Sequence, residues 1–215
     1  LKKARDPDYL RVFIAGQNRL PAAYVQRANG TTITEDIVFD PRSIDFPEEA
    51  EAIDGLLAKS RDLRYVVLRI QLAMLAGRLN DAADGFEALA RLLEAHDAEV
   101  HPVKTSERQG ALNGADAVNT VVLPMQFAGL AGSRDVSLRR IRVARGDGTP
   151  LSSETGLDLD RMLSTLATPG NADKVDRTHA AARRIAEAMD RVRKVCRTRT
   201  SDAFDMKFPR LRPVV

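Results

Sequence analysis

Two histidines and two carboxylates lie close together in the stretch HDAEVH, and these residue types can bind zinc. His96 and His101 are five residues apart, however, whereas side chains four residues apart would share one face of a helix. Pro102 follows His101 and favours an extended backbone there. We therefore interpret the stretch as a polar helix end that leads into a loop, and we expect neither a metal site nor a cofactor.

The single cysteine, Cys196, is a second candidate for chemistry, because a thiolate can act as a nucleophile. The remaining histidine, His179, lies on the same expected helix at roughly 25 Å, given about 1.5 Å per residue. The sequence also contains no glycine-rich phosphate loop, no GxSxG and no HExxH motif. We expect no catalytic residue and no small-molecule substrate, so the chain is not predicted to be an enzyme.

A block of charge precedes a long apolar run in the stretch LLAKSRDLRYVVLRIQLAML, residues 56–75. The block contains Lys59, Arg61, Asp62 and Arg64. Ser60 is the expected N-cap of a helix over 61–77, so cations lie where the helix dipole disfavours them. In one interpretation, the cations of the block form ion pairs with carboxylates of neighbouring helices and organise the fold. In the other, Arg61 and Arg64 project outward and bind an acidic partner. We favour the first interpretation, because the block adjoins a helix that must be buried.

The helix over 61–77 is apolar on most of its faces, which indicates that it is buried. An amphipathic helix is predicted over 81–96, and the short connection at residues 77–80 makes the two an antiparallel hairpin. The acidic residues on the polar face of this second helix are Asp84, Glu87 and Glu94. We predict an all-α fold, an irregular multi-helix bundle built around this hairpin at about 61–96.

The remaining helices are expected over residues 7–28, 47–59, 106–131, 156–168 and 173–199. Gly16 and Pro21 should divide the first of these helices, and Pro124 should kink or split the third. Residues 30–46 lack a helical period and are expected to form an extended connector. Residues 135–148 alternate imperfectly, which predicts a short strand or an irregular connector.

The composition predicts an aliphatic core, since 44% of residues are hydrophobic but only 5% are aromatic and none is Trp. One cysteine fits a reducing compartment, and no apolar run is long enough for a membrane span. The first residue is Leu rather than Met, so we expect a piece of a longer protein. Residues 1–34 are interpreted as a helical extension and residues 35–215 as the main domain.

The net charge of +3 is unevenly distributed, because residues 174–215 carry +7 and residues 1–173 carry −4. In the last helix, apolar residues follow the spacing of a packing seam: Ala182, Ile185, Met189, Val192 and Cys196. We favour packing of this seam on its own domain over a coiled coil between chains. The candidate basic surface beside it consists of Arg183, Arg184, Arg191, Lys194 and Arg197. A nucleic-acid-binding helix over 177–199 is the alternative, but no aromatic residues are interleaved for base stacking.

Residues 56–102 resemble the N-terminal domain of the type VI secretion family ImpA, also called TssA. The residues that match in order are Leu56, Leu57, Lys59, Ser60, Arg61, Asp62, Leu63, Arg64, His101 and Pro102. Weaker similarity in EDIVFDP, RQGALNG and VSLRRIRVARG extends the resemblance over about residues 35–146. The sequence departs from the family just before His101, where DAEV replaces a stretch that often carries an aromatic residue.

The resemblance implies a helical, non-enzymatic component of the bacterial type VI secretion machine. It implies a protein–protein docking module linked to assembly of the baseplate, tail tube and sheath, in the cytoplasm beside the inner membrane. Baseplate, tube, sheath or membrane-complex proteins would be its partners, and C-terminal regions outside this sequence would build a homo-oligomer. Nucleic acid is not an implied partner. The matching motif residues would serve either the fold or docking.

Overall fold

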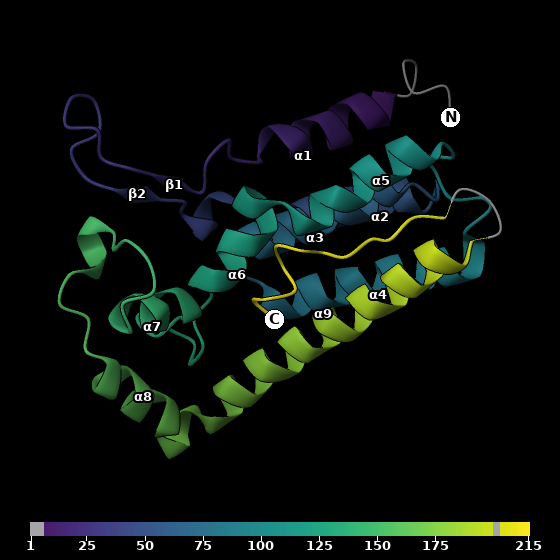
Figure 1. The fold of residues 1–215 in the computed structure, drawn as a ribbon. Helices are drawn as coiled ribbons and strands as arrows, with labels where there is room; N and C mark the ends of the chain where they lie inside the picture. The colour runs from purple at the N-terminus through teal and green to yellow at the C-terminus, as the bar shows by residue number, and fades with distance from the viewer. Residues whose placement is uncertain (1–6, 200–202) are drawn as a thin grey trace.

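The structure is a computed structural model and describes residues 7–199 and 203–215, so the first residues of the expected 1–34 extension lie outside the described part. Helices form one elongated assembly with a short two-stranded ribbon at one end (Figure 1), which confirms the predicted all-α class. The α-helices are α1 (Ala15–Asn18), α2 (Phe46–Leu57), α3 (Leu63–Leu75), α4 (Leu79–His96), α5 (Thr105–Asn113), α6 (Leu123–Phe127), α7 (Leu138–Ala144), α8 (Leu159–Ala167) and α9 (Ala172–Thr198).

Shorter elements connect these helices. Two π-helical segments are Tyr9–Ile14 and Val118–Val122, and 3-10 turns are Pro41–Ser43, Gly114–Asp116, Ser152–Glu154 and Pro169–Asn171. The strands β1 (Val25–Gln26) and β2 (Ile37–Val38) pair antiparallel. Strand β2 lies within residues 30–46, which were expected to be extended, whereas β1 lies within residues 7–28, where the prediction of helix is wrong beyond Asn18. Among the helices of the described residues, none is long and apolar enough to cross a membrane.

The predicted hairpin is formed by α3 and α4, and α3 lies at the centre of the core. Leu63, Ile70, Leu72 and Leu75 of α3 are each 0% exposed, because α2, α4, α5 and the Val118–Val122 segment surround the helix. The turn between α3 and α4 contains Gly77, whose φ of 70° favours glycine. Gly77 therefore permits the tight turn, and the apolar side chains on most faces of α3 place this helix in the core.

The long helix α9 packs along α4, as the seam spacing predicted (Figure 1). The buried side chains of α9 are Ala181, Ile185, Ala188, Met189, Val192 and Cys196. Ala182 of the predicted seam is only partly buried, and its neighbour Ala181 takes the fully buried position. The seam is therefore part of the chain's own core.

The C-terminal segment, residues 203–215, returns from the end of α9 and lies against the core (Figure 1). Met206, Phe208 and Leu211 are buried, and the backbone N–H of Leu211 donates to the buried carboxylate of Asp116 at 2.7 Å. None of the expected helices extends into this segment. It completes the core beside α4, since the Phe86 and Phe208 rings meet edge-on at 6.5 Å.

Residues 138–144 form α7, so the prediction of a strand or irregular connector over 135–148 is wrong. The hydroxyl of Ser137 accepts the backbone N–H of Arg140 and caps the helix. Val136 and Ile141 pack with Met162 of α8 in a small cluster separate from the main core. The helix is short, and only Ile141 within it is buried, so its sequence shows no clear helical period.

Gly16 and Pro124 do not break helices as expected. Gly16 lies inside α1, where a Cβ atom would lie 3.0 Å from Cδ2 of Leu68, so the glycine permits close packing on α3. Pro124 lies where the π-helical Val118–Val122 segment passes into α6, and the helical backbone continues through it. The region breaks instead at Ala117, whose ψ of 132° is extended.

Candidate functional site

The two parts of the motif that suggested a family, residues 59–64 and the pair His101 and Pro102, are joined by backbone hydrogen bonds. His101 N–H donates to the carbonyl of Arg61 at 2.8 Å, and Leu63 N–H donates to the carbonyl of His101 at 2.8 Å. Asp62 and His101 thus form a parallel bridge. The start of α3 and the loop after α4 are consequently held together at one end of the hairpin.

Asp62 is the N-cap of α3, so the assignment of this role to Ser60 is wrong. The carboxylate of Asp62, which is 2% exposed, accepts the backbone N–H of Arg64 at 3.1 Å. It also accepts Nε of the same arginine at 2.8 Å, and this hydrogen bond raises the pKa of Arg64. Ser60 cannot cap because the bridge to His101 extends the chain through Asp62, and the helix begins only at Leu63.

Each cation of the charge block lies against a carboxylate of its own chain. Lys59 pairs with Asp8, and this contact lowers the pKa of the aspartate. Arg61 lies 2.7 Å from Glu99 in the loop after α4. The side chains of Lys59 and Arg61 remain about half exposed, whereas that of Arg64 is 22% exposed. The block therefore links α3 to both the N-terminal segment and the loop that contains His101.

Arg108 of α5 is a buried part of this site that the sequence analysis did not single out. Its side chain is 1% exposed, and its guanidinium lies 2.6 Å from the carboxylate of Asp97. It also donates to the backbone carbonyls of Asp97, Val100 and Pro102 at 3.0, 2.9 and 3.1 Å. Arg108 therefore organises the whole loop from α4 to Pro102. The stretch RQGALNG contains Arg108 and was a sequence signal for it. The role of Arg108 could not be predicted from that stretch, because its acceptors are mainly backbone carbonyls.

Two residues of the candidate basic surface of α9 form ion pairs with α4, and the other three do not. Arg184 pairs with Asp84 and lies 2.7 Å from Glu87, and Arg191 lies 2.9 Å from Glu94. These hydrogen bonds lower the pKa values of Glu87 and Glu94. The acids lie on the face of α4 that was expected to be solvated, so Arg184 and Arg191 join two helices of one chain.

The other three cations of that surface are exposed. Arg183 pairs with Glu187 of the same helix at 3.4 Å. Lys194 and Arg197 form no ion pair with any residue that the structure describes, although both are exposed near the end of α9. The structure therefore leaves a smaller basic surface than the sequence suggested.

The candidate metal ligands His96 and His101 and the candidate nucleophile Cys196 form no reactive site among the described residues. Nδ1 of His96 lies 3.9 Å from Glu99, and within residues 7–199 and 203–215 no three metal-ligating side chains converge. Cys196 is 1% exposed, and burial raises the pKa of its thiol to about 12, with a further contribution from Asp97. The thiol is therefore protonated near neutral pH.

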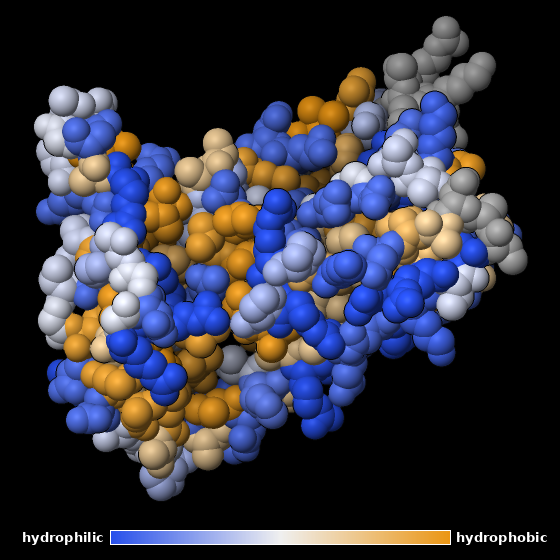
Figure 2. Space-filling model, in the orientation of Figure 1, coloured by the Kyte–Doolittle hydropathy of each residue, from blue (hydrophilic) through white to orange (hydrophobic). Residues whose placement is uncertain are grey.

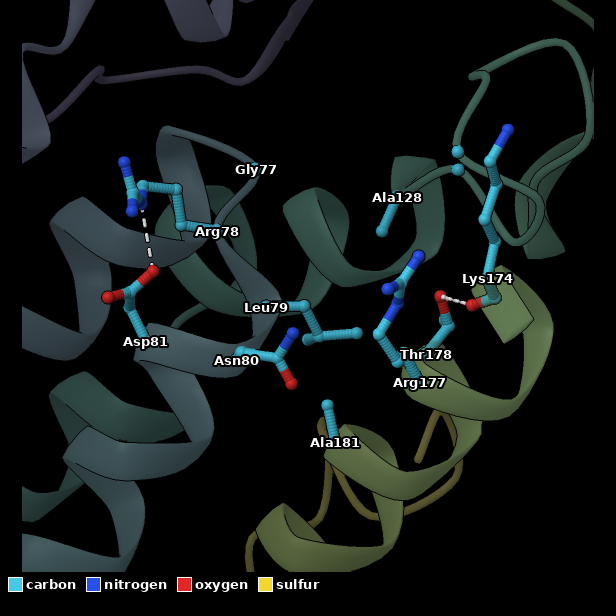
Figure 3. Close-up of a pocket in the computed structure, with 12 residues that line it drawn as sticks. Gly77, Arg78, Leu79, Asn80, Asp81, Ala128, Lys174, Arg177, Thr178 and Ala181 are labelled. Atoms are coloured by element: carbon cyan, nitrogen blue, oxygen red, sulfur yellow. Dashed lines mark hydrogen bonds and ion pairs between the residues drawn. The ribbon is translucent and has the colours of Figure 1, made fainter.

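Two hollows flank the first turns of α9. The first, of about 280 Å³, lies between the start of α4, the loop after α6 and α9 (Figure 3). Leu79 extends from α4 toward α9, the side chain of Arg177 extends toward Ala128, and Arg78 is paired with Asp81 at 2.8 Å. The second, of about 560 Å³, lies between α8, the loop before α7 and α9. Lys174 lines both hollows.

A family model described as ImpA, N-terminal, type VI secretion system matches residues 3–117, more than half of the chain. The matched stretch starts before the resemblance noted at residue 35 and ends before residue 146. It contains the hairpin, the bridged motif and Arg108. No curated protein and no solved structure matches the chain. The helices α6 to α9 lie after the matched stretch. The residues of α8 and α9 that line the two hollows therefore lie outside it as well.

Proposed function

The chain belongs to the ImpA N-terminal family and is thus a type VI secretion component, and we propose that it acts there as a non-enzymatic protein–protein docking module. The observation that carries this proposal is the family match, which covers the hairpin and its bridged motif. The proposed partners are baseplate, tail-tube, sheath or membrane-complex proteins, met in the cytoplasm beside the inner membrane. We further propose that other regions of the full-length protein mediate its homo-oligomerisation.

Within this function, we assign the motif to the fold rather than to docking. The charged members pair internally, Lys59 with Asp8, Arg61 with Glu99 and Arg64 with Asp62. His101 and Pro102 contribute backbone carbonyls to Leu63 and Arg108. These contacts support a motif that holds the N-terminal segment, α3, the loop after α4 and α5 together, so the docking surface would lie elsewhere.

The alternative of a nucleic-acid-binding helix over 177–199 has less support from the structure. Arg184 and Arg191 are engaged by carboxylates of α4, and a phosphate would have to compete with those partners. Only Arg183, Lys194 and Arg197 of the candidate surface remain exposed. Protein docking is therefore the function we retain.

Binding to a panel of purified components tests the proposal. The chain would be titrated with baseplate, tube, sheath and membrane-complex proteins of the same bacterium, and with generic duplex DNA as a comparison. We expect saturable binding to at least one protein component. Binding to none of them, together with DNA affinity that falls steeply between about 50 and 200 mM salt, would replace docking by the nucleic-acid alternative.

A further inference from the structure

Three cations at the two hollows have no carboxylate partner among the residues that the structure describes. Arg161 of α8 lines the larger hollow, Arg177 of α9 lines the smaller one, and Lys174 lines both. None of the three forms an ion pair with another residue of the described ranges, 7–199 and 203–215. Lys174 reaches toward the loop after α6, where a Cβ on Gly132 would lie 3.0 Å from its Cδ (Figure 3).

The acids that line the same hollows are already engaged. Asp81 pairs with Arg78 at 2.8 Å. Asp135 accepts a hydrogen bond from the hydroxyl of Ser133 at 2.8 Å and pairs with Arg140 at 3.4 Å. Asp158 caps α8 by accepting the backbone N–H of Arg161 at 3.0 Å. Among the described lining residues, the three cations without an ion pair therefore outnumber the one carboxylate without an ion pair, Asp158, in contrast to the Arg184 and Arg191 positions farther along α9.

Apolar side chains lie beside these cations. Leu79, Ala128 and Ala181 line the smaller hollow, and Val136, Leu157 and Met162 line the larger one. Figure 2 shows hydrophobic surface over the α7 and α8 region, next to hydrophilic surface. Leu163 of α8 is 40% exposed in the same region. A ligand that fits both hollows would thus carry negative charge and aliphatic groups together.

We propose that the two hollows bind an acidic linear segment of a partner protein, in which carboxylates alternate with aliphatic side chains. The carboxylates would pair with Lys174, Arg177 and Arg161, and the aliphatic side chains would enter the hollows beside Leu79 and Met162. This inference rests on the proposed docking function and names the partner's chemistry. A peptide fits better than nucleic acid, because cations are few and no aromatic side chain lines either hollow for base stacking.

A double charge reversal, Lys174→Glu with Arg177→Glu, tests the proposal. Both side chains are exposed and lack an ion pair in the described structure, so the variant should keep the parent's melting temperature. The matched control is Lys194→Glu with Arg197→Glu, which reverses the same charges on exposed positions of the same helix. Lys194 lies about 30 Å from Lys174 along α9, at about 1.5 Å per residue.

The probe is an array of overlapping short peptides that covers the baseplate, tube, sheath and membrane-complex proteins. We expect the labelled parent chain to bind acidic, aliphatic peptides, the hollow variant to lose about tenfold or more in affinity for them, and the control to bind like the parent. Equal binding by all three chains, or equal loss in both variants, would overturn the proposal.

Two further outcomes would also overturn it. Displacement of the peptides by inorganic phosphate or duplex DNA at similar concentration would indicate a general anion site. An array without any bound peptide would exclude a linear segment, even where the folded components of the panel bind. That last result would leave the proposed docking function standing, so failure of the inference and failure of the function are distinguishable.

Discussion

The buried guanidinium of Arg108 lies 2.6 Å from the carboxylate of Asp97, and the two residues connect α5 to the end of α4. The same guanidinium donates to the backbone carbonyls of Asp97, Val100 and Pro102. One side chain therefore fixes the loop that presents His101 to Arg61 and Leu63. The family motif depends on a residue outside its most recognisable block.

Replacing Arg108 with Met should destabilise the fold strongly. The change leaves buried carbonyl groups without a donor, and breaking a buried charged network costs about 3–5 kcal/mol. Arg91→Met is the matched control, because Arg91 is 60% exposed and pairs with Glu87 within one helix, a contact worth about 0.3–0.5 kcal/mol. Urea unfolding of both variants measures the difference, and similar free energies of unfolding would show that the Arg108 network contributes little.

Asp62→Ala should destabilise the protein more than Asp62→Asn. Alanine removes the N-cap of α3, which costs about 0.5–2 kcal/mol, and leaves Arg64 without its carboxylate. Asparagine keeps a side-chain oxygen that can accept the backbone N–H of Arg64, although it loses the charge and the second acceptor oxygen that faces Nη2 of Arg64. The prediction fails if the two variants unfold at the same denaturant concentration.

Gly85→Ala should be destabilising although alanine favours helices. A Cβ at Gly85 of α4 would lie 2.7 Å from Cγ1 of Ile70 in α3, so the hairpin would have to separate, at about 1–3 kcal/mol. Gly55→Ala in α2 meets no atom within 4 Å and should stabilise by about 0.5–1 kcal/mol. Thermal melts of the two variants should move in opposite directions, and a stabilised Gly85→Ala variant would contradict the packing of α3 on α4.

The hairpin could be predicted from the sequence because its signals are local. The apolar residues on most faces of residues 61–77 indicate a buried helix, and Gly77 indicates the turn that ends it. The cap of α3 could not be predicted in this way, because the choice between Ser60 and Asp62 is decided by pairing with the distant His101.

The charges of the site were harder to predict than the helices. A helical pattern shows that Arg184 and Arg191 lie beside the seam, but not that α4 presents Glu87 and Glu94 to them. Arg108 was likewise missed, because three of its four acceptors are backbone carbonyls that leave no trace in side-chain spacing. The short helix α7 was missed because it has a single buried residue, Ile141.

Stability should fall in alkaline solution partly through Cys196. Burial raises the pKa of its thiol from 9.0 to about 12, so between these values the thiol ionises in the unfolded chain but not in the native one. The contribution of the buried, neutral thiol to the free energy of unfolding is therefore complete below about pH 9. This contribution is lost as the pH rises toward 12. Cys196→Ala should lack this loss, so the parent's free energy of unfolding should fall relative to that variant by about 1.4 kcal/mol per pH unit above pH 9. Parallel pH profiles would show that the native thiol ionises normally.

The charge block of the motif builds the fold while docking occurs elsewhere, and a binding measurement on one double variant tests this division of roles most directly. Lys59→Gln with Arg61→Gln removes the two half-exposed cations of the block, whose surface pairs are worth only about 0–1 kcal/mol each, so the variant should fold. Its dissociation constant would be measured for the secretion component that binds the parent chain. We predict a value within about twofold of the parent's, because these side chains face Asp8 and Glu99 rather than a partner. A folded variant whose affinity is weaker by about tenfold or more would identify the block as the docking surface and contradict the account.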